Sequence, residues 1–388
     1  MITSRFDSRI PFYLFAAAVC SMMVSLFLLQ LFFGLLAILW LCEKTENKKK
    51  AFDIFTLLIA VFGIIRLLSI IFSQYPSSSI QSLYKEALFY LGFLSMSFYL
   101  KAMNKEKVEK IAFTFSISSI AVALIGLTLF NLRLVERAES FSSGYATFSS
   151  FLLAAAGVYI ALPFDYKKKI NRLLWAAGLS IIFSAIITSL GRTNIAIAAL
   201  LFLAGLIFRK IKIKPAVVII FLTAVICLLS FQNNKQLLTK RVENPAGLSD
   251  RDIIWKGFET LKFQHPFLGF GPRTFHDIFP YVDQLGDKLI GSWHNDFIQM
   301  YFESGLLGLL SFAVLIFMII YFSVVYLKKA GQTNNFRNIV IGILSGTSAL
   351  VLSSLTAGFI SSPVLSIAFA FLISLLSAVM FYTNSQPG

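Results

Sequence analysis

The chain has 388 residues, of which 57% are hydrophobic and 14% are charged, and its mean hydropathy is +0.78. A soluble globular domain of this length does not need so much apolar sequence, so the composition indicates a membrane protein. The formal net charge of +15 would suggest nucleic acid as the partner of a soluble protein. Here the Lys and Arg residues concentrate in alternate short loops, and we expect membrane lipids rather than nucleic acid around the chain.

Apolar runs of about 20 residues, the length that crosses a bilayer as a helix, recur along almost the whole sequence. The alternating strands of about ten residues that a membrane β-barrel needs do not occur. We therefore predict an all-α polytopic membrane protein with about twelve transmembrane helices. The predicted helices cover residues 11–26, 27–42, 52–72, 82–100, 111–130, 141–164, 173–190, 193–208, 215–231, 304–327, 338–357 and 362–382.

The first apolar stretch, residues 11–42, is too long for one untilted span. It also lacks the small-residue cleavage site of a secretory signal peptide. We predict two short helices that are broken near Ser25 rather than a cleaved signal.

The positive charges of the loops predict the orientation. The loops EKTENKKK, KAMNKEKVEK, DYKKKINR, RKIKIK and KKAGQTNNFR carry four, four, four, four and three Lys or Arg residues. The intervening loop SQYPSSSIQ has none, and NLRLVERAES has two. With Arg5 and Arg9 at the N-terminus, the positive-inside rule therefore puts the basic loops and both termini on the cytoplasmic side of the membrane.

One connection, residues 232–303, is far longer than an ordinary loop and faces the opposite side of the membrane, which is the periplasm in a Gram-negative cell. Its many aromatic residues predict an ordered segment, and RDIIWKGFETLKF within it reads as an amphipathic helix. The predicted organisation is an N-terminal transmembrane bundle (1–231), this partly helical periplasmic loop (232–303) and C-terminal transmembrane helices (304–388).

The stretch SWHNDFIQMYFESGLLGLL, from position 292, places one of only three histidines where this loop returns to the membrane. A histidine at a water interface titrates near neutral pH, so His294 is a candidate general base. Asn295 and Asp296 are candidates to fix its ring tautomer, and Asp296, Gln299 and Glu303 recur at helical spacing on one polar face. The alternative is a histidine that only binds a neighbouring loop.

Several arginines fall on the predicted periplasmic side. Arg192 lies in the short turn TSLGRTN, Arg251 opens the amphipathic helix in LSDRDIIW, and Arg273 follows in GFGPRTF. A planar guanidinium group donates paired hydrogen bonds to phosphate, so these residues are candidates to hold a lipid pyrophosphate. The alternative for each is contact with the phosphate groups of bilayer lipids.

Two further cations fall within predicted spans. Arg66 lies about six residues, or roughly 9 Å of helix rise, from the periplasmic end of its span, and Lys85 lies just inside the next. Charge inside a membrane is costly and is often functional, so both are candidates to line a substrate cavity. The sequence has no P-loop, no dinucleotide-binding glycine motif and no carboxylate pair suited to a metal, and we expect no metal and no cofactor.

The order of these motifs resembles the O-antigen ligase and polymerase superfamily over residues 180–325. The motifs are SLGRTN, then SDRDIIWKGFETLKFQHPFLGFGPRTF, then HNDFIQMYFESGLLGLL, and HPFLGFGPRTF and HN followed by ESGLLG are the most specific. The resemblance implies a metal-independent, inverting glycosyltransferase of the membrane-embedded GT-C type. Carried over by motif, Arg192 and Arg251 would bind the donor pyrophosphate, and His294 would deprotonate the acceptor.

In O-antigen ligases the donor is a glycan on undecaprenyl pyrophosphate and the acceptor is the lipid A core oligosaccharide. A repeat-unit polymerase of the same superfamily uses an acceptor glycan that is still on its lipid carrier. Protein O-glycosylating relatives and Gram-positive polymer synthases also share the superfamily. A flippase or transporter would have as many helices, but it does not need an ordered periplasmic loop with a base.

Overall fold

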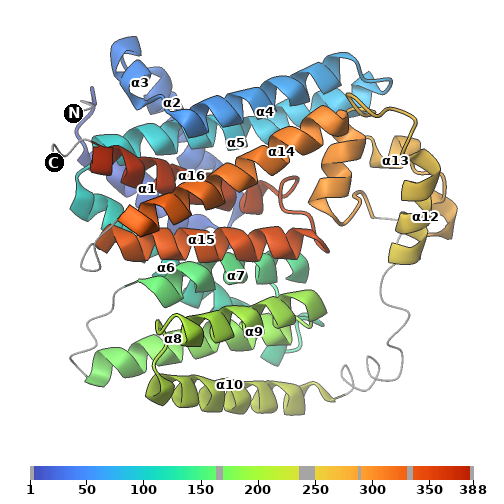
Figure 1. The fold of residues 1–388 in the computed structure, drawn as a ribbon. Helices are drawn as coiled ribbons and strands as arrows, with labels where there is room; N and C mark the ends of the chain where they lie inside the picture. The colour runs from blue at the N-terminus through green and yellow to red at the C-terminus, as the bar shows by residue number, and fades with distance from the viewer. Residues whose placement is uncertain (1–3, 163–168, 236–249, 287–289, 330–334, 385–388) are drawn as a thin grey trace.

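The computed structural model describes residues 4–162, 169–235, 250–286, 290–329 and 335–384 (Figure 1). Every regular element in these ranges is a helix, as predicted, and the only β pairing is an isolated bridge between Ser140 and Ser143. The elements are α1 (Arg9–Ser21), α2 (Leu26–Leu41), α3 (Thr45–Ala51), α4 (Ile54–Ile71), α5 (Pro76–Ala102), α6 (Lys105–Asn131), α7 (Tyr145–Ala161), α8 (Lys169–Thr188), α9 (Arg192–Ile207), α10 (Ile213–Asn233), α12 (Arg251–Leu261), α13 (Phe275–Ile278), the 3-10 helix η1 (Val282–Gln284), α14 (Asp296–Lys329), α15 (Asn335–Ser354) and α16 (Pro363–Asn384).

A helix lies at each of the twelve predicted ranges. Within the described ranges, seven helices are long and apolar enough to cross a membrane, and the pair α2 and α3, bent by 115°, makes an eighth if it counts as one span. The helices α1, α7 and α9 are apolar but shorter. The polytopic membrane class is therefore supported, while twelve as the number of spans stays a prediction.

The break between α1 and α2 occurs where the sequence predicts it. Met23 has a φ of 64°, and the Ser25 side chain caps α2 by accepting a hydrogen bond from the Leu28 amide. The helix predicted to begin at residue 304 corresponds to the part of α14 that follows its break at Gly305, and the described helix extends back to Asp296. Its first turns are polar, so hydropathy does not detect them, and they are helical because their polar side chains are bonded inside the protein.

The helix α4 illustrates how these segments pack. Its side chains at spacings of three and four residues, from Phe55 through Phe62 to Ser69, are buried. Apolar residues on its other faces, such as Leu57 and Ile64, are 58% exposed. A helix that is apolar all round but buried on one stripe is typical of contact with lipid on the remaining faces.

The described parts of the basic loops lie at one end of the bundle (Figure 1). The Lys101 ammonium lies 2.9 Å from Asp53, and the Lys210 ammonium donates a hydrogen bond of 2.6 Å to Asn338. The described chain begins and ends at this same end, and α12 and α13 lie at the opposite end (Figure 1). The arrangement of the ends agrees with the predicted topology, whereas the compartment that each end faces stays a prediction from charge.

The described part of the segment 232–303 packs around a small hydrophobic core of its own. The Trp293 and Phe302 rings stack with their centroids 4.0 Å apart, and Phe275 stacks on Phe279 at 4.7 Å. The buried members of this core are Ile254, Leu261, Phe270, Phe275, Ile278, Phe279, Leu285, Trp293 and Phe302. The order predicted from aromatic content is confirmed for residues 250–286 and 290–302, and residues 236–249 and 287–289 lie outside the described ranges.

Candidate functional site

The two most specific sequence motifs meet at a break in α14. At Gly305 the backbone leaves the helical conformation, with φ 64° and ψ −164°. The backbone of the preceding motif HPFLGFGPRTF bonds across this break. Its hydrogen bonds are Phe270 N to Phe302 O (2.7 Å), Gly271 N to Glu303 O (3.1 Å) and Leu306 N to Pro266 O (2.7 Å).

This close approach of the two backbones explains why both motifs have glycine there. Gly269 and Gly305 have φ angles of 69° and 64°, which L-residues with a Cβ rarely adopt. A Cβ at Gly305 would overlap the backbone of Phe267, and one at Gly269 would overlap the backbone of Phe302. Glycine at these positions therefore allows the loop to pack directly against the broken helix.

A buried ion network lies next to the break. The Arg66 guanidinium pairs with Glu86 on α5 and, at 2.6 Å, with Glu303 on α14. The same guanidinium is 3.3 Å from the Ser304 hydroxyl. The side chains of Arg66 and Glu303 are each only 5% exposed, so these bonds connect α4, α5 and α14 inside the bundle.

The second carboxylate oxygen of Glu303 continues the network. It accepts hydrogen bonds from the Arg273 backbone amide at 2.9 Å and from the Gln299 side chain at 3.0 Å. Arg273 has a φ of 62°, and its Nε is buried with no hydrogen-bond partner in the described part of the chain. Glu303 thus fixes both the start of α14 and the loop that carries Arg273.

His294 is half-buried and lies two residues before the start of α14, with a φ of 50°. The next residue caps the helix, because Asn295 Oδ1 accepts from the amides of Phe297 (2.9 Å) and Ile298 (3.2 Å). Asn295 Nδ2 donates to the Leu355 carbonyl at 3.3 Å. The candidate base therefore lies at a helix start that is tied to the connection between α15 and α16.

Asp296 makes a second tie to that connection. Its fully buried carboxylate accepts hydrogen bonds from the amides of Phe359 (2.7 Å) and Ile360 (3.3 Å). A Cβ at Gly358 would lie 2.7 Å from Asp296 Oδ1, so the turn passes close to the carboxylate. A role for Asn295 and Asp296 in fixing the His294 tautomer stays a prediction.

Both leading arginines lie near the same connection. Arg251, exposed at the start of α12, donates from Nη2 to the Thr356 carbonyl at 3.1 Å. Arg192 is exposed at the start of α9. Two residues later, buried Asn194 accepts a hydrogen bond of 2.7 Å from the Ser353 hydroxyl. The segments that carry Arg192, Arg251 and His294 therefore all contact residues 353–360. These are the last two residues of α15 and the first six residues after it, and we call them the α15–α16 turn.

Comparison with protein families gives a match over residues 175–313 to the family model described as O-antigen ligase. The matched segment, about a third of the chain, is similar to this family. The predicted resemblance to the O-antigen ligase and polymerase superfamily is thereby confirmed. A comparison with curated proteins finds no match.

The matched O-antigen ligase segment contains most of the predicted site. The predicted site residues that it includes are Arg192, Arg251, Arg273, His294, Asn295, Asp296 and Glu303. Arg66 and the α15–α16 turn lie outside the matched residues in the sequence, but both contact them in the folded chain. Lys85 does not join the network: its side chain is exposed, and its ammonium lies 5.8 Å from the centre of the Tyr84 ring.

Three features of the candidate site were not predicted from the sequence. Glu86 shares the Arg66 guanidinium, Asn194 ties the Arg192 helix to its neighbours, and the α15–α16 turn joins the motifs. Asn194 could have been found from the sequence, since it lies in the same motif, SLGRTN, as Arg192. The turn had none, because small and apolar residues dominate its sequence SSLTAGFI.

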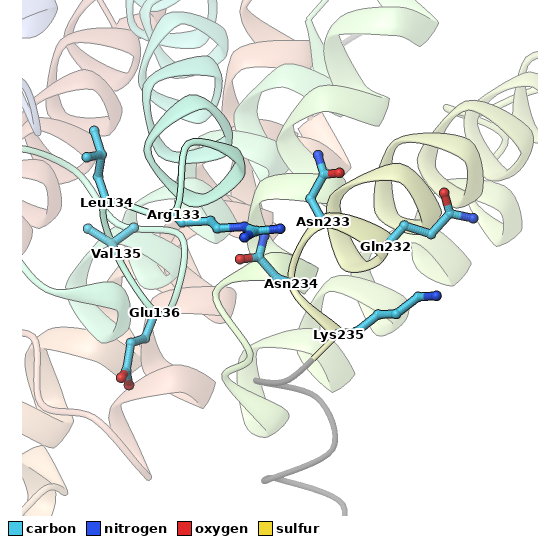
Figure 2. Close-up of a pocket in the computed structure, with 8 residues that line it drawn as sticks. All are labelled: Arg133, Leu134, Val135, Glu136, Gln232, Asn233, Asn234 and Lys235. Atoms are coloured by element: carbon cyan, nitrogen blue, oxygen red, sulfur yellow. The ribbon is translucent and has the colours of Figure 1, made fainter.

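A cavity of about 490 Å³ opens elsewhere, between the C-terminal ends of α6 and α10 (Figure 2). Figure 2 shows the Arg133 side chain reaching toward Asn234, whose amide donates to the Phe130 carbonyl at 3.2 Å. The lining residues are Arg133, Leu134, Val135, Glu136, Gln232, Asn233, Asn234 and Lys235. None of the predicted site residues within residues 175–313 lines this cavity. No group of three or more His, Cys, Asp or Glu residues that could hold a metal occurs in the part of the chain that the structure describes.

Proposed function

We propose that the chain is an O-antigen ligase, which moves a glycan from undecaprenyl pyrophosphate to the lipid A core oligosaccharide. The observation that carries this proposal is the meeting of the three motif segments at the α15–α16 turn. The turn lies at the end of the bundle opposite the basic loops, so we infer a periplasmic site in the inner membrane.

The two exposed arginines are the proposed donor-binding groups. Arg251 uses Nη2 to bond the Thr356 carbonyl, and a guanidinium has five N–H donors, so the fork retains donors for a pyrophosphate. Arg192 at the start of α9 adds a second fork and the favourable end of the helix dipole. Arg273 and Lys85 are proposed to add positive charge near the glycan.

Arg66 has a different proposed role from the substrate contact that the sequence suggests. Its guanidinium is buried and pairs with Glu86 and Glu303. We infer that it acts on the site indirectly, because it fixes Glu303, which in turn holds the loop of Arg273.

The proposed reaction is a single inverting displacement. His294 accepts the proton of an acceptor hydroxyl as that oxygen forms a bond to the anomeric carbon of the donor. The bond from the anomeric carbon to the pyrophosphate oxygen breaks on the opposite face, and the leaving pyrophosphate carries the electron pair. Pyrophosphate is an activated leaving group, so neither a nucleotide cofactor nor a metal is part of the proposal.

The alternative is a repeat-unit polymerase, which uses the same donor chemistry with an acceptor that is still lipid-linked. The lipopolysaccharide of a deletion strain, resolved on a gel, separates the two. A ligase predicts loss of the whole O-chain ladder with accumulation of lipid-linked polymer, and a polymerase predicts a single repeat on the core. An unchanged ladder would contradict both functions, and complementation by the wild-type chain is the matched control.

A further inference from the structure

We propose that the α15–α16 turn, residues 353–360, is the element that positions the donor arginines against His294, and that Asn194 and Asp296 are the positioning residues that hold it. This inference rests on the proposed function. It extends the site beyond the matched residues 175–313, because the turn lies 40 positions or more after the end of that match, as position 353 follows 313 by 40.

Asn194 connects the Arg192 helix to the turn. Its amide donates to Ser149 Oγ at 2.7 Å, and its carbonyl accepts from Ser353 Oγ at 2.7 Å. Ser150 and Ser353 are also 2.7 Å apart, so α7, α9 and α15 meet in one buried set of side-chain hydrogen bonds. Asn194 is 5% exposed, whereas Arg192, in the same first turn of α9, is exposed. The buried residue therefore sets the direction in which the exposed one projects.

The next two residues after α15 receive the other motif segments. Leu355 O accepts from Asn295, which caps the helix that follows His294. Thr356 O accepts from Arg251. These acceptors are carbonyls of consecutive residues, whose Cα atoms are about 3.8 Å apart, so the turn fixes the spacing between the Arg251 fork and the start of α14.

Asp296 binds the other end of the α15–α16 turn. Its carboxylate holds the amides of Phe359 and Ile360, and Gly358 leaves no room for a side chain beside it. Hydrogen bonds therefore fix both ends of the α15–α16 turn. Asn194, near the start of α9, bonds residue 353, and Asp296, at the start of α14, bonds residues 359 and 360. A shift of the turn would move both arginines relative to the base.

A double-mutant cycle on Asn194 and Arg192 tests this arrangement in the full-length protein in detergent. The dissociation constant of undecaprenyl pyrophosphate would be measured for Asn194→Ala, Arg192→Ala and the double variant. Asn194→Ala should weaken binding roughly threefold to tenfold, and the double variant should bind no worse than Arg192→Ala. The matched control is Asn234→Ala, an asparagine that is also 5% exposed but bonds α6 instead of the turn, and it should leave binding unchanged.

The outcomes separate this inference from the proposed function. Losses that multiply in the double variant, or normal binding by Asn194→Ala, would overturn the positioning role and leave the donor site of Arg192 in place. Normal binding by Arg192→Ala would overturn that donor site and the role of Asn194 with it.

Gly358→Ala is a second variant, chosen because its Cβ would push against Asp296 rather than remove a bond. Glycan transfer by the folded, correctly inserted variant should show a lower kcat, since the added Cβ displaces the turn next to His294. A normal kcat would overturn the part of the inference that concerns Asp296.

Discussion

Arg66 Nη1 and Glu303 Oε2 lie 2.6 Å apart although 237 positions separate the two residues in the chain. Their ion pair joins α4 to the start of α14 within the bundle. The same guanidinium also forms an ion pair with Glu86, so two carboxylates share one cationic partner. Breaking a buried ion pair by removing one partner is costly, because the remaining charge keeps its desolvation penalty without compensation.

The first prediction concerns this network. Arg66→Met should destabilise the protein by about 3–5 kcal/mol, measured as a lower melting temperature and a lower yield of folded protein in detergent. The double variant Arg66→Met/Glu303→Gln should recover part of the loss, because it removes one of the stranded charges. Lys85→Ala, an exposed cation, is the control and should change stability by less than about 0.5 kcal/mol. Equal melting temperatures for Arg66→Met and the wild type would contradict the prediction.

The network also shows how far the sequence alone could lead. Hydropathy predicted a helix at every apolar range, because a membrane span must be apolar and about 20 residues long. The spacing of Asp296, Gln299 and Glu303 predicted their shared face, since it depends only on helical periodicity. The partners of that face could not be predicted in this way, because Arg66, Arg273 and the α15–α16 turn reach it through tertiary contacts that leave no local pattern.

The second prediction tests the helix break. Gly305→Ala should be strongly destabilising, because the φ of 64° is unfavourable for alanine and the Cβ meets the Phe267 backbone, which cannot rotate away. Gly34→Ala is the matched control inside α2, where nothing lies within 4 Å of the added atom. It should be neutral or stabilise by up to about 1 kcal/mol. Similar melting temperatures for the two variants would show that the break does not constrain the fold.

The third prediction concerns the basic end of the bundle. Burial by itself raises the pKa of the Asp53 carboxyl, but the Lys101 ammonium and hydrogen bonds from Ser377 and Thr56 hold the pKa below its ordinary value. Such a group stabilises the fold above its unfolded pKa of about 3.9, and the stabilisation is lost as pH falls through the folded pKa. Asp53→Asn should therefore lower the melting temperature by the same amount at every pH between about 5 and 8.

The control for Asp53→Asn is Glu106→Gln, which removes an ion pair that is exposed on both sides. Exposed pairs contribute little, so its melting temperature should match the wild type. A difference between Asp53→Asn and wild type that shrinks from pH 5 to pH 8 would show that another group dominates.

The fourth prediction concerns the donor arginines. Arg192→Ala and Arg251→Ala should each weaken donor binding by about ten- to a hundredfold, since each loses a charge-assisted contact worth roughly 1.5–3 kcal/mol. Lysine at either position should restore binding only in part, because a point charge lacks the guanidinium fork. Arg209→Ala is the control, an exposed arginine that follows the opposite end of α9, and should bind normally. Normal transfer by both folded alanine variants would place the donor elsewhere.

The last prediction concerns His294 as the general base. A positioned base typically contributes about 10² to 10⁴ in rate, so His294→Ala should lose most of its turnover while donor binding and the melting temperature change little. His276→Ala, an exposed histidine on α13, is the matched control and should retain normal turnover.

The pH profile distinguishes a base from a residue that only supports the loop. An imidazole accepts a proton only in its neutral form, so the wild-type rate should fall as pH drops and the His294 ring becomes protonated. The residual rate of His294→Ala should lack this limb, because no group remains to be protonated there. Purified protein with lipid-linked donor and core acceptor provides the measurement. If His294→Ala transferred glycan at a normal rate, or kept the acidic limb at a reduced rate, the proton would be taken by another group.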